Sequence, residues 1–349
     1  YADNASLRQQ FYEAYSTRAS DQGPQAGQFD NTPLVSEILM LRQQIAQLLG
    51  FEHHAHYRLE TRMANSVDEI EVFLRDLAER ARPMAEKQLE ALTKFAKTHG
   101  AADSLQPWDI AYYTEKYREA TLGINDERLK PYFEVKSVFG GLFETAKRLF
   151  GLSFERDENV QVWDPHVSFY RIKDSDGQEM AGLYLDIYAR PKKAGGAWMD
   201  VCRSRFMKGE HRQLPIAYLT CNFASPTQGK PSLLTHDDVV TLFHEFGHCL
   251  HHLLTEVDLP AVAGIHGVEW DAVELPSQLL EGWSMAPEAL NTYAHHFETH
   301  EPLPEKELLS LRENRQFQGA LALLRQIQFA LTDLALHRQG DADPISIAR

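Results

Sequence analysis

The sequence predicts a mainly α-helical fold that contains one small β region. Three observations lead to this prediction. Apolar residues recur at helical spacing through most of residues 1–155, short alternating or continuous apolar runs replace them between 160 and 223, and helical spacing returns after Asp237. The length of 349 residues suggests two regions, which we place at 1–155 and 156–349.

The helices of the first half have recognisable starts and stops. Asn4 is a suitable N-cap, and Ser66 with Glu69 forms a capping-box pattern. Gly50 favours the end of a helix, and Pro83 is expected to break or kink the helix that contains it. The expected helices are a segment through Leu7, Phe11 and Tyr15, then 35–49, 67–99 and 139–150, with a loop over 20–33.

Turn-forming residues divide the β region into strands. The run Asp-Ser-Asp-Gly at 174–177 has the composition of a turn and separates two apolar runs. The expected strands cover 160–162, 167–172, 180–188 and 215–223. They are expected to form one small sheet within 160–223, between two helical regions.

The composition restricts the class of protein. Fifty acidic and 35 basic residues give a formal net charge of −15, which argues against nucleic acid or an anionic membrane as the main partner. No apolar run approaches the ~18 residues of a membrane-spanning helix. Three cysteines without a Cys-x-x-Cys pattern favour a reducing, cytoplasmic setting. Nothing in the sequence indicates an oligomeric state.

A helix over 236–256 is expected to carry the chemistry. Thr235 is a plausible N-cap, with Asp238 as its capping-box partner. At helical spacing one face carries Val239, Leu242, Phe246, Leu250 and Leu253, and the other carries His244, Glu245, His248, His251 and His252. The helix is therefore expected to bury the first face and present the second.

The pattern H-E-x-x-H at residues 244–248 indicates a metal site on that second face. His244 and His248 lie one helical turn apart, so their imidazoles can converge on one ion. Glu245 projects beside them and can reach a water on the metal without ligating it. A solvated polar helix face is the plainer alternative for such a histidine pair.

The third ligand is not fixed by spacing. A catalytic zinc uses three protein ligands and keeps one position open. The metzincin pattern requires Gly at 251 and His at 254, and this chain has His251 and Leu254, so that class is excluded. A flexible loop at 261–267 can reverse the chain into a helix over 269–285. The downstream carboxylates are Glu256, Asp258, Glu269, Asp271, Glu274 and Glu281, and spacing does not choose among Glu269, Glu274 and Glu281.

Residues 244–248, together with Val-Glu-Leu-Pro-Ser-Gln at 273–278 and Glu-Gly-Trp at 281–283, resemble the thimet oligopeptidase family of zinc metallopeptidases. That family includes neurolysin and dipeptidyl carboxypeptidase. Further likeness lies at 15–24, 106–113 and 217–223, and the resemblance runs from residue 1 to about 344. It implies a zincin-like, neurolysin-like helical metallopeptidase region with a small β-sheet beside the active-site cleft. Residues 1–155 would then be a channel wall, and 156–349 the catalytic region.

The resemblance implies a role for each site residue. His244, His248 and Glu274 would hold one zinc ion per chain, and Glu245 would act as the catalytic base. Glu269 and Asp271 are candidates to accept the outer N–H of the zinc-bound imidazoles, because such histidines usually donate to an acceptor, and solvent-facing carboxylates are the equal alternative. His251 and His252 are expected on the helix surface or behind the ligands.

The same likeness suggests where a substrate binds. Gly182, Leu183 and Tyr184 lie in a segment expected to form a sheet beside the cleft. As an edge strand, that segment could pair with an extended peptide. A purely structural hairpin is the alternative, and 195–197 is expected to be a mobile loop beside it.

The resemblance implies a zinc-dependent oligopeptidase that hydrolyses internal bonds of short unstructured peptides through a zinc-activated water. A catalytically incomplete zinc- and peptide-binding fragment, a dipeptidyl carboxypeptidase of the same family, and a purely structural zinc site are the alternatives. Family members extend further at the N-terminus and carry a Gly-rich segment with Tyr and His nearer the C-terminus. This chain is therefore expected to be the central part of a longer enzyme.

Overall fold

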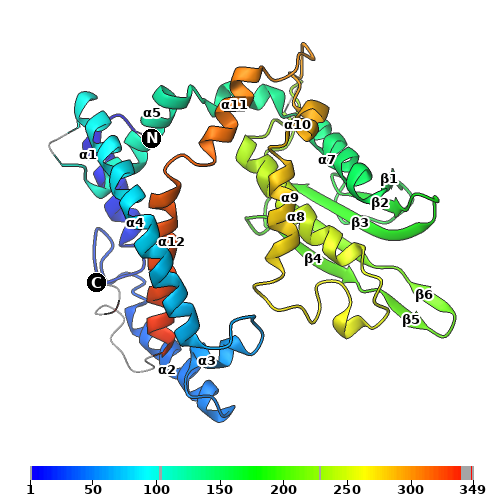
Figure 1. Cartoon of the computed structure of the whole chain (residues 1–349), viewed down its shortest axis with the longest axis horizontal. Coiled ribbons are helices and arrows are strands. Elements are labelled where there is room, and N and C mark those ends of the chain that lie inside the picture. The colour runs from blue at the N-terminus through cyan, green and yellow to red at the C-terminus, as the bar shows by residue number, and fades with distance from the viewer. Residues whose placement is uncertain (1, 102–103, 228, 339–346, 348–349) are drawn as a thin grey trace. The chain divides into compact units, whose positions relative to one another are not determined.

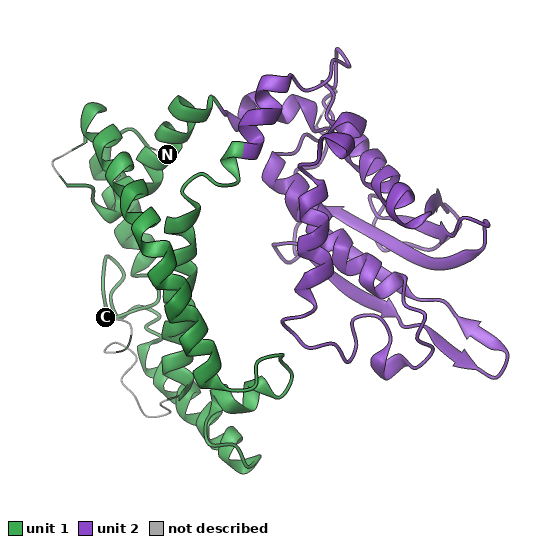
Figure 2. Cartoon of the chain, in the orientation of Figure 1, with its two compact units in different colours: residues 1–123, 313–349 green, residues 124–312 purple. Residues whose placement is uncertain are grey.

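The computed structural model describes residues 2–101, 104–227, 229–338 and 347. It contains two compact units, which are coloured separately in Figure 2. Unit 1 comprises residues 1–123 and 313–349, and unit 2 comprises residues 124–312. The two ends of the chain therefore belong to the same unit.

Unit 1 is built from helices. They are α1 (Ala5–Ser16), α2 (Thr32–Leu48), α3 (His54–Leu59), α4 (Val67–Thr98), α5 (Pro107–Leu122) and α12 (Gly319–Arg338). The long helices α4 and α12 lie side by side although they are far apart in the sequence (Figure 1). Leu334 of α12 packs against the buried Leu59 and Val67, so α12 completes a core that α3 and α4 begin.

Both N-caps predicted for unit 1, Asn4 and Ser66, are confirmed, whereas the helix expected over 35–49 already begins at Thr32. The side-chain oxygen of Asn4 accepts a hydrogen bond from the backbone N–H of Leu7 at 3.1 Å, and Ser66 accepts one from Glu69 at 3.1 Å. Of the two outcomes expected at Pro83, a break or a kink, the break does not occur, because α4 continues through this residue. Proline removes one helical hydrogen bond, and here the packing of α4 along α12 outweighs that loss.

Unit 2 combines helices with a sheet. Its helices are α6 (Asp126–Leu129), η1 (Lys130–Tyr132), α7 (Val135–Phe150), α8 (His236–Leu253), η2 (Pro260–Val262), α9 (Glu274–Trp283), α10 (Pro287–Tyr293) and α11 (Glu305–Asn314), the last of which crosses into unit 1. Its strands are β1 (Ser153–Arg156), β2 (Ser168–Lys173), β3 (Glu179–Tyr188), β4 (Trp198–Arg203), β5 (Phe206–Lys208), β6 (His211–Gln213) and β7 (Ile216–Phe223).

The main sheet has the strand order β1-β2-β3-β7-β4, and β5 with β6 forms a separate hairpin. Strands β3 and β7 are parallel, whereas the other neighbours are antiparallel. The carboxyl ends of β3 and β7 therefore lie at the same end of the sheet. Among the described residues, β4 pairs only with β7, so it is an edge strand.

The prediction that Gly182, Leu183 and Tyr184 belong to an edge strand is wrong. They lie in β3, the middle strand. Its neighbours on both sides use its backbone groups: Gly182 is opposite Arg171 of β2 and Ile216 of β7. A strand with both edges paired has no free N–H or C=O row to offer a peptide. Only β1 and β4 occupy edges of the described sheet.

The strand predictions hold where the strands are buried. The runs expected at 167–172, 180–188 and 215–223 correspond to β2, β3 and β7. Residues 160–162 lie in a loop, contrary to prediction. The sequence did not indicate β1, β4, β5 or β6. These strands are short and largely exposed, so the apolar pattern that marks a buried strand is missing.

Helix α8 lies against the sheet and supports the site. The Thr235–Asp238 capping box is present as predicted. Phe246 packs against Phe143 of α7 and Phe154 of β1, with ring centroids 6.3 and 5.9 Å apart. The five apolar residues predicted for its inner face, Val239, Leu242, Phe246, Leu250 and Leu253, are all buried.

The opposite face of α8 is less open than predicted. His252 is completely buried and lies 3.0 Å from the carbonyl oxygen of Arg203, so its placement on the helix surface is wrong. The loop after α8 covers it: a Cβ on Gly264 would lie 2.5 Å from the Nδ1 of His252. Glu245 is also buried. The sequence pattern could not show this cover, because it comes from other elements.

The two units do not coincide with the predicted regions 1–155 and 156–349. Helix α7 packs against α10 and β1 in unit 2, and α12 packs against α4 in unit 1. Periodicity along the chain identifies helices but does not reveal which distant segments pack together. None of the helices in the described part of the chain is long and apolar enough to cross a membrane.

Candidate metal centre

Two helices, α8 and α9, approach closely to form the candidate site. Gly247 of α8 permits this contact, because a Cβ at that position would lie 2.6 Å from the carbonyl oxygen of Pro276 and 2.6 Å from the Cα of Ser277. Helix α9 begins at Glu274, later than the predicted 269–285. Pro276 is its third residue, where a helix has no internal acceptor for the backbone N–H. The proline therefore costs α9 no hydrogen bond.

Three side chains converge between these helices. The Oε2 atom of Glu274 lies 3.3 Å from Nε2 of His244 and 3.4 Å from Nε2 of His248. One ligand atom from each of the three residues lies within 4.8 Å of the others. The hydroxyl of Ser277 lies 2.9 Å from the same Oε2 of Glu274 and 2.8 Å from the backbone carbonyl oxygen of Glu274, and its single O–H can be donated to either oxygen.

Glu281 contacts the ring nitrogen of His244 that points away from Glu274. Its Oε1 lies 2.7 Å from Nδ1 of His244. A carboxylate at this distance accepts, so Nδ1 carries the proton and Nε2 keeps its lone pair toward Glu274. The sequence left Glu281 as one of three candidate ligands, and the structure gives it this orienting contact.

The donor set suits zinc. Two imidazole nitrogens and one carboxylate are the ligands of catalytic zinc sites that keep one position open. Burial lowers the pKa of His248, while Glu274 raises it and His244 lowers it again. The net lowering favours the neutral imidazole, which is the form that binds a metal.

Glu245 lies beside the three donors without belonging to them. Its side chain is buried, and burial raises its pKa above the usual range of a carboxyl group. His244 acts against that shift, Glu274 adds to it, and a hydrogen bond with the backbone of Met199 opposes it. A raised pKa brings a carboxylate closer to the value useful to a general base. Met199 belongs to β4, so the edge strand borders the site.

The other predicted residues lie outside this group. Glu269 and Asp271, named as candidates to accept from the zinc ligands, are both exposed and lie before α9, and the acceptor for Nδ1 of His244 is Glu281. Asp258 accepts from Arg205 at 2.7 Å, and Glu256 is exposed. The contact of β4 with Glu245 was also not predicted, and no sequence signal marked β4.

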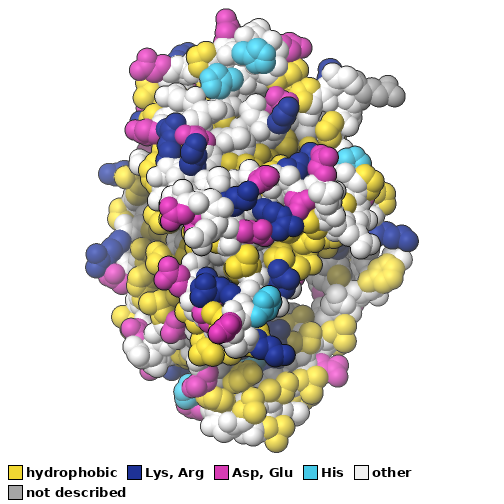
Figure 3. Space-filling model, turned by 90° about the vertical axis from the view of Figure 1, so that its right-hand side faces the viewer, with side chains coloured by type: hydrophobic (Ala, Val, Ile, Leu, Met, Phe, Trp, Pro, Cys, Tyr) yellow, Lys and Arg dark blue, Asp and Glu magenta, His cyan; other side chains and the backbone are white. Residues whose placement is uncertain are grey.

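The charges on one face of the molecule are mixed. In the face shown in Figure 3, acidic and basic side chains alternate with apolar ones and form no extended patch of one sign. The three cysteines, Cys202, Cys221 and Cys249, are free.

The chain belongs to peptidase family M3, which it matches over residues 1–348. This confirms the family resemblance drawn from residues 244–248 and 273–283. The chain is 51% identical to oligopeptidase A of Salmonella typhimurium over 340 residues, which are 97% of this chain and 50% of that protein. It is also 51% identical to oligopeptidase A of Escherichia coli over 344 residues, 98% of this chain and 51% of that protein.

A more distant relative is the dipeptidyl carboxypeptidase of Escherichia coli, 33% identical over 310 residues, 88% of this chain and 45% of that protein. The chain thus spans about half the length of the curated relatives it matches. The predicted helical architecture with a small sheet agrees with the fold of unit 2 and with the family.

Proposed function

We propose that this chain carries the zinc centre of an oligopeptidase that hydrolyses internal bonds of short, unstructured peptides. The observation that supports this most directly is the convergence of His244, His248 and Glu274 beside a fourth, buried carboxylate, Glu245. The family and the oligopeptidase A relatives support the substrate class. A cytoplasmic setting agrees with the three free cysteines.

His244, His248 and Glu274 would hold the ion. Bound there, zinc would supply Lewis-acid chemistry by polarising the scissile carbonyl and making water more acidic. Glu281 keeps His244 in the tautomer that presents Nε2. The Ser277 hydroxyl, 2.9 Å from the Glu274 carboxylate, would help to keep that carboxylate pointed at both histidines.

Glu245 moves the proton. Its carboxylate takes a proton from the attacking water and later gives it to the leaving amine. Burial raises its pKa, and this makes it a stronger base than an exposed glutamate. Because Glu245 is not among the converging donors, it remains available for this task.

Strand β4 is our candidate for the surface that aligns the peptide. Its outer edge has no strand partner among the described residues, and the backbone of Met199 already contacts Glu245. An extended peptide added to this edge would pass next to the base. The peptide-pairing role that the sequence suggested for 182–184 is thus reassigned to 198–203.

The test is hydrolysis of a short internally quenched peptide whose C-terminus is amidated. We expect turnover by the zinc-loaded parent chain and a loss of ~10²–10⁴-fold in Glu245→Gln, with zinc content unchanged. Glu256→Gln, an exposed carboxylate beyond α8, is the matched control and should keep the parent rate. Parent-like turnover by Glu245→Gln would refute the assignment of the base.

The same peptide separates the remaining candidates. Cleavage of an amidated peptide supports internal hydrolysis, whereas a dipeptidyl carboxypeptidase should require a free C-terminus. Because the chain spans half of its relatives, a zinc- and peptide-binding fragment is the second candidate. Peptide binding and zinc retention without turnover would favour that candidate.

A further inference from the structure

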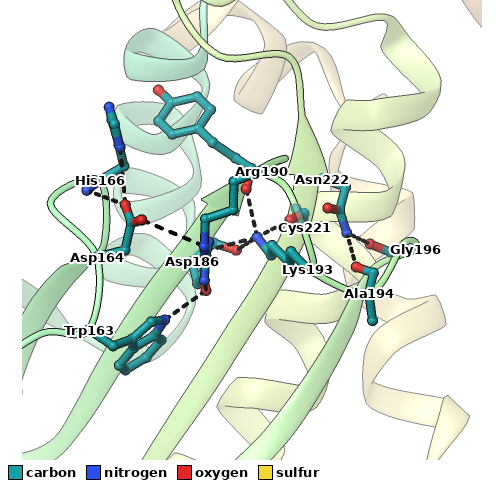
Figure 4. Close-up of polar contacts among 11 residues, drawn as sticks. Trp163, Asp164, His166, Asp186, Arg190, Lys193, Ala194, Gly196, Cys221 and Asn222 are labelled. Atoms are coloured by element: carbon teal, nitrogen blue, oxygen red, sulfur yellow. Dashed lines mark hydrogen bonds and ion pairs between the residues drawn. The ribbon is translucent and has the colours of Figure 1, made fainter.

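A network of buried charges lies where the chain passes from β3 to β4. These two strands are not neighbours, because β7 lies between them. The connecting segment, 189–197, therefore crosses the end of the sheet at which the parallel strands β3 and β7 both finish. Figure 4 shows the side chains that meet there.

Lys193 ties this segment to both strand ends. Its ammonium nitrogen lies within hydrogen-bonding distance of four oxygens, which share its three N–H donors: the carboxylate of Asp186 at 2.8 Å, and the backbone carbonyls of Asp186 at 2.8 Å, Tyr188 at 2.9 Å and Cys221 at 2.6 Å. The first three acceptors belong to β3, and Cys221 belongs to β7. The lysine side chain is only 5% exposed. A buried ammonium group with this many partners strongly restricts where its backbone can lie.

Asn222 holds the next stretch of the segment. Its amide nitrogen donates to the carbonyl of Ala194 at 2.8 Å and to that of Gly196 at 2.7 Å. The two N–H donors of the amide group thus bind the carbonyls of the residues on either side of Gly195. The loop at 195–197, expected to be mobile, thus has the carbonyl of Gly196 anchored to β7, as is the carbonyl of Ala194 just before it.

Asp186 completes the network from the sheet. Arg190 donates to both carboxylate oxygens at 2.5 and 2.7 Å, and Trp163 donates to one of them at 3.1 Å. Arg190 also lies 3.6 Å from Asp164. The buried charges are therefore paired, and the segment is fixed on both sides of Lys193.

We infer that Lys193 and Asn222 are positioning residues: they fix the start of β4, and with it the edge strand and the Met199 backbone that contacts Glu245. Strand β4 begins at Trp198, two residues after the Gly196 carbonyl that Asn222 holds. Its first residues pair with the far end of β7, next to Asn222. A shift of the segment would thus be passed directly to the edge strand. The catalytic part of this inference depends on the proposed function.

The experiment uses Lys193→Met and Asn222→Ala in the full chain, with Arg171→Met as control. Arg171 also makes two ion pairs, with Asp157 and Glu179, elsewhere in the sheet, and its side chain is more exposed than that of Lys193. We expect amide hydrogen exchange over 197–203 to rise ~10-fold or more in both variants, as for a locally opened segment, and to stay unchanged in the control. Bound zinc per chain should stay at the parent value.

Binding of the quenched peptide is measured in the Glu245→Gln background, where it is not consumed. Lys193→Met and Asn222→Ala should weaken binding ~10-fold or more, whereas Arg171→Met should not, since edge-strand pairing depends on a fixed backbone. Faster exchange with unchanged peptide affinity would overturn the positioning role and leave a purely structural one. Unchanged exchange over 197–203 would overturn the inference entirely.

Two further outcomes are informative. If Lys193→Met fails to fold, the milder Asn222→Ala decides. Removing the Asn222 amide leaves two carbonyls to solvent but leaves no buried charge without its partner. If the Glu245→Gln parent binds no peptide, the proposed function fails. The exchange data then still decide whether Lys193 and Asn222 fix β4.

Discussion

The Nδ1 atom of His244 lies 2.7 Å from the Oε1 atom of Glu281, and this contact joins the two helices of the metal centre. Glu281 follows Glu274 by seven residues, two turns of α9, so both carboxylates face α8. Glu274 faces the Nε2 atoms of the two histidines, and Glu281 faces the opposite side of one ring. One helix therefore supplies both a ligand and the group that orients another ligand.

We predict that Glu281→Ala weakens zinc binding by ~10–100-fold, the usual effect of losing the partner of a metal-bound histidine. Without the carboxylate, His244 is free to rotate or to change its tautomer. The measurement is competition for zinc with a chromophoric chelator. Glu288→Ala, an exposed residue of α10, is the control. Equal zinc affinity in parent and Glu281→Ala would show that the contact does not orient the ring.

The choice of Glu274 as the third ligand gives a second prediction. Glu274→Gln should lose zinc on dialysis, with an affinity loss greater than the ~10–100-fold of an outer partner. Glu269→Gln should retain one zinc per chain, because Glu269 is exposed and lies before α9 begins. Zinc content is measured by atomic emission after dialysis. Loss of zinc from Glu269→Gln alone would reverse the assignment.

The features that the sequence predicted correctly are those that depend on local spacing. His244 and His248 share a face because they are one turn apart, and the Thr235–Asp238 cap is a contact within one turn. The buried runs of β2, β3 and β7 also follow from local pattern. These predictions need no knowledge of which elements meet.

The sequence could not predict what depends on long-range packing. Whether β3 is an edge strand depends on β7, which follows it after three other strands. The burial of His252 depends on Arg203 and Gly264, which lie in other elements. Glu281 meets His244 only because α9 packs against α8. In each case the deciding neighbour lies far away in the sequence.

Gly247 provides a third prediction, about the distance between α8 and α9. Alanine inside a helix is usually more stable than glycine by ~0.5–1 kcal/mol, yet here its Cβ would lie 2.6 Å from the backbone of α9. We expect Gly247→Ala to push α9 away. Because α9 carries both Glu274 and Glu281, this shift should weaken zinc binding ~10-fold or more.

The control for that variant lies in α9 itself. A Cβ on Gly282 would meet nothing within 4 Å, so Gly282→Ala should keep zinc affinity and folding stability close to the parent values. Zinc competition and urea unfolding are measured on both variants. Parent-like zinc binding by Gly247→Ala would mean that α9 can shift without moving its carboxylates.

The last prediction concerns acid stability and the buried carboxylate of Asp186. Burial alone would raise its pKa, but hydrogen bonds from Arg190, Lys193 and Trp163 outweigh burial and lower the pKa to about 2, from 3.8. A group whose pKa is lower in the folded state stabilises the fold above its unfolded pKa. That stabilisation is lost as the pH falls from about 4 through about 2.

Asp186→Asn should therefore reduce the free energy of unfolding of unit 2 by about 2 kcal/mol near neutral pH, and by progressively less below pH ~4. Urea unfolding is followed at several pH values between 7 and ~2.5 by tryptophan fluorescence, to which Trp163, whose indole contacts Asp186, contributes together with the other four tryptophans. Glu158→Gln, whose side chain is 80% exposed, is the control and should track the parent. If the gap between Asp186→Asn and the parent stayed constant down to pH ~2.5, the variant would be acting through lost packing and not through the charge of Asp186.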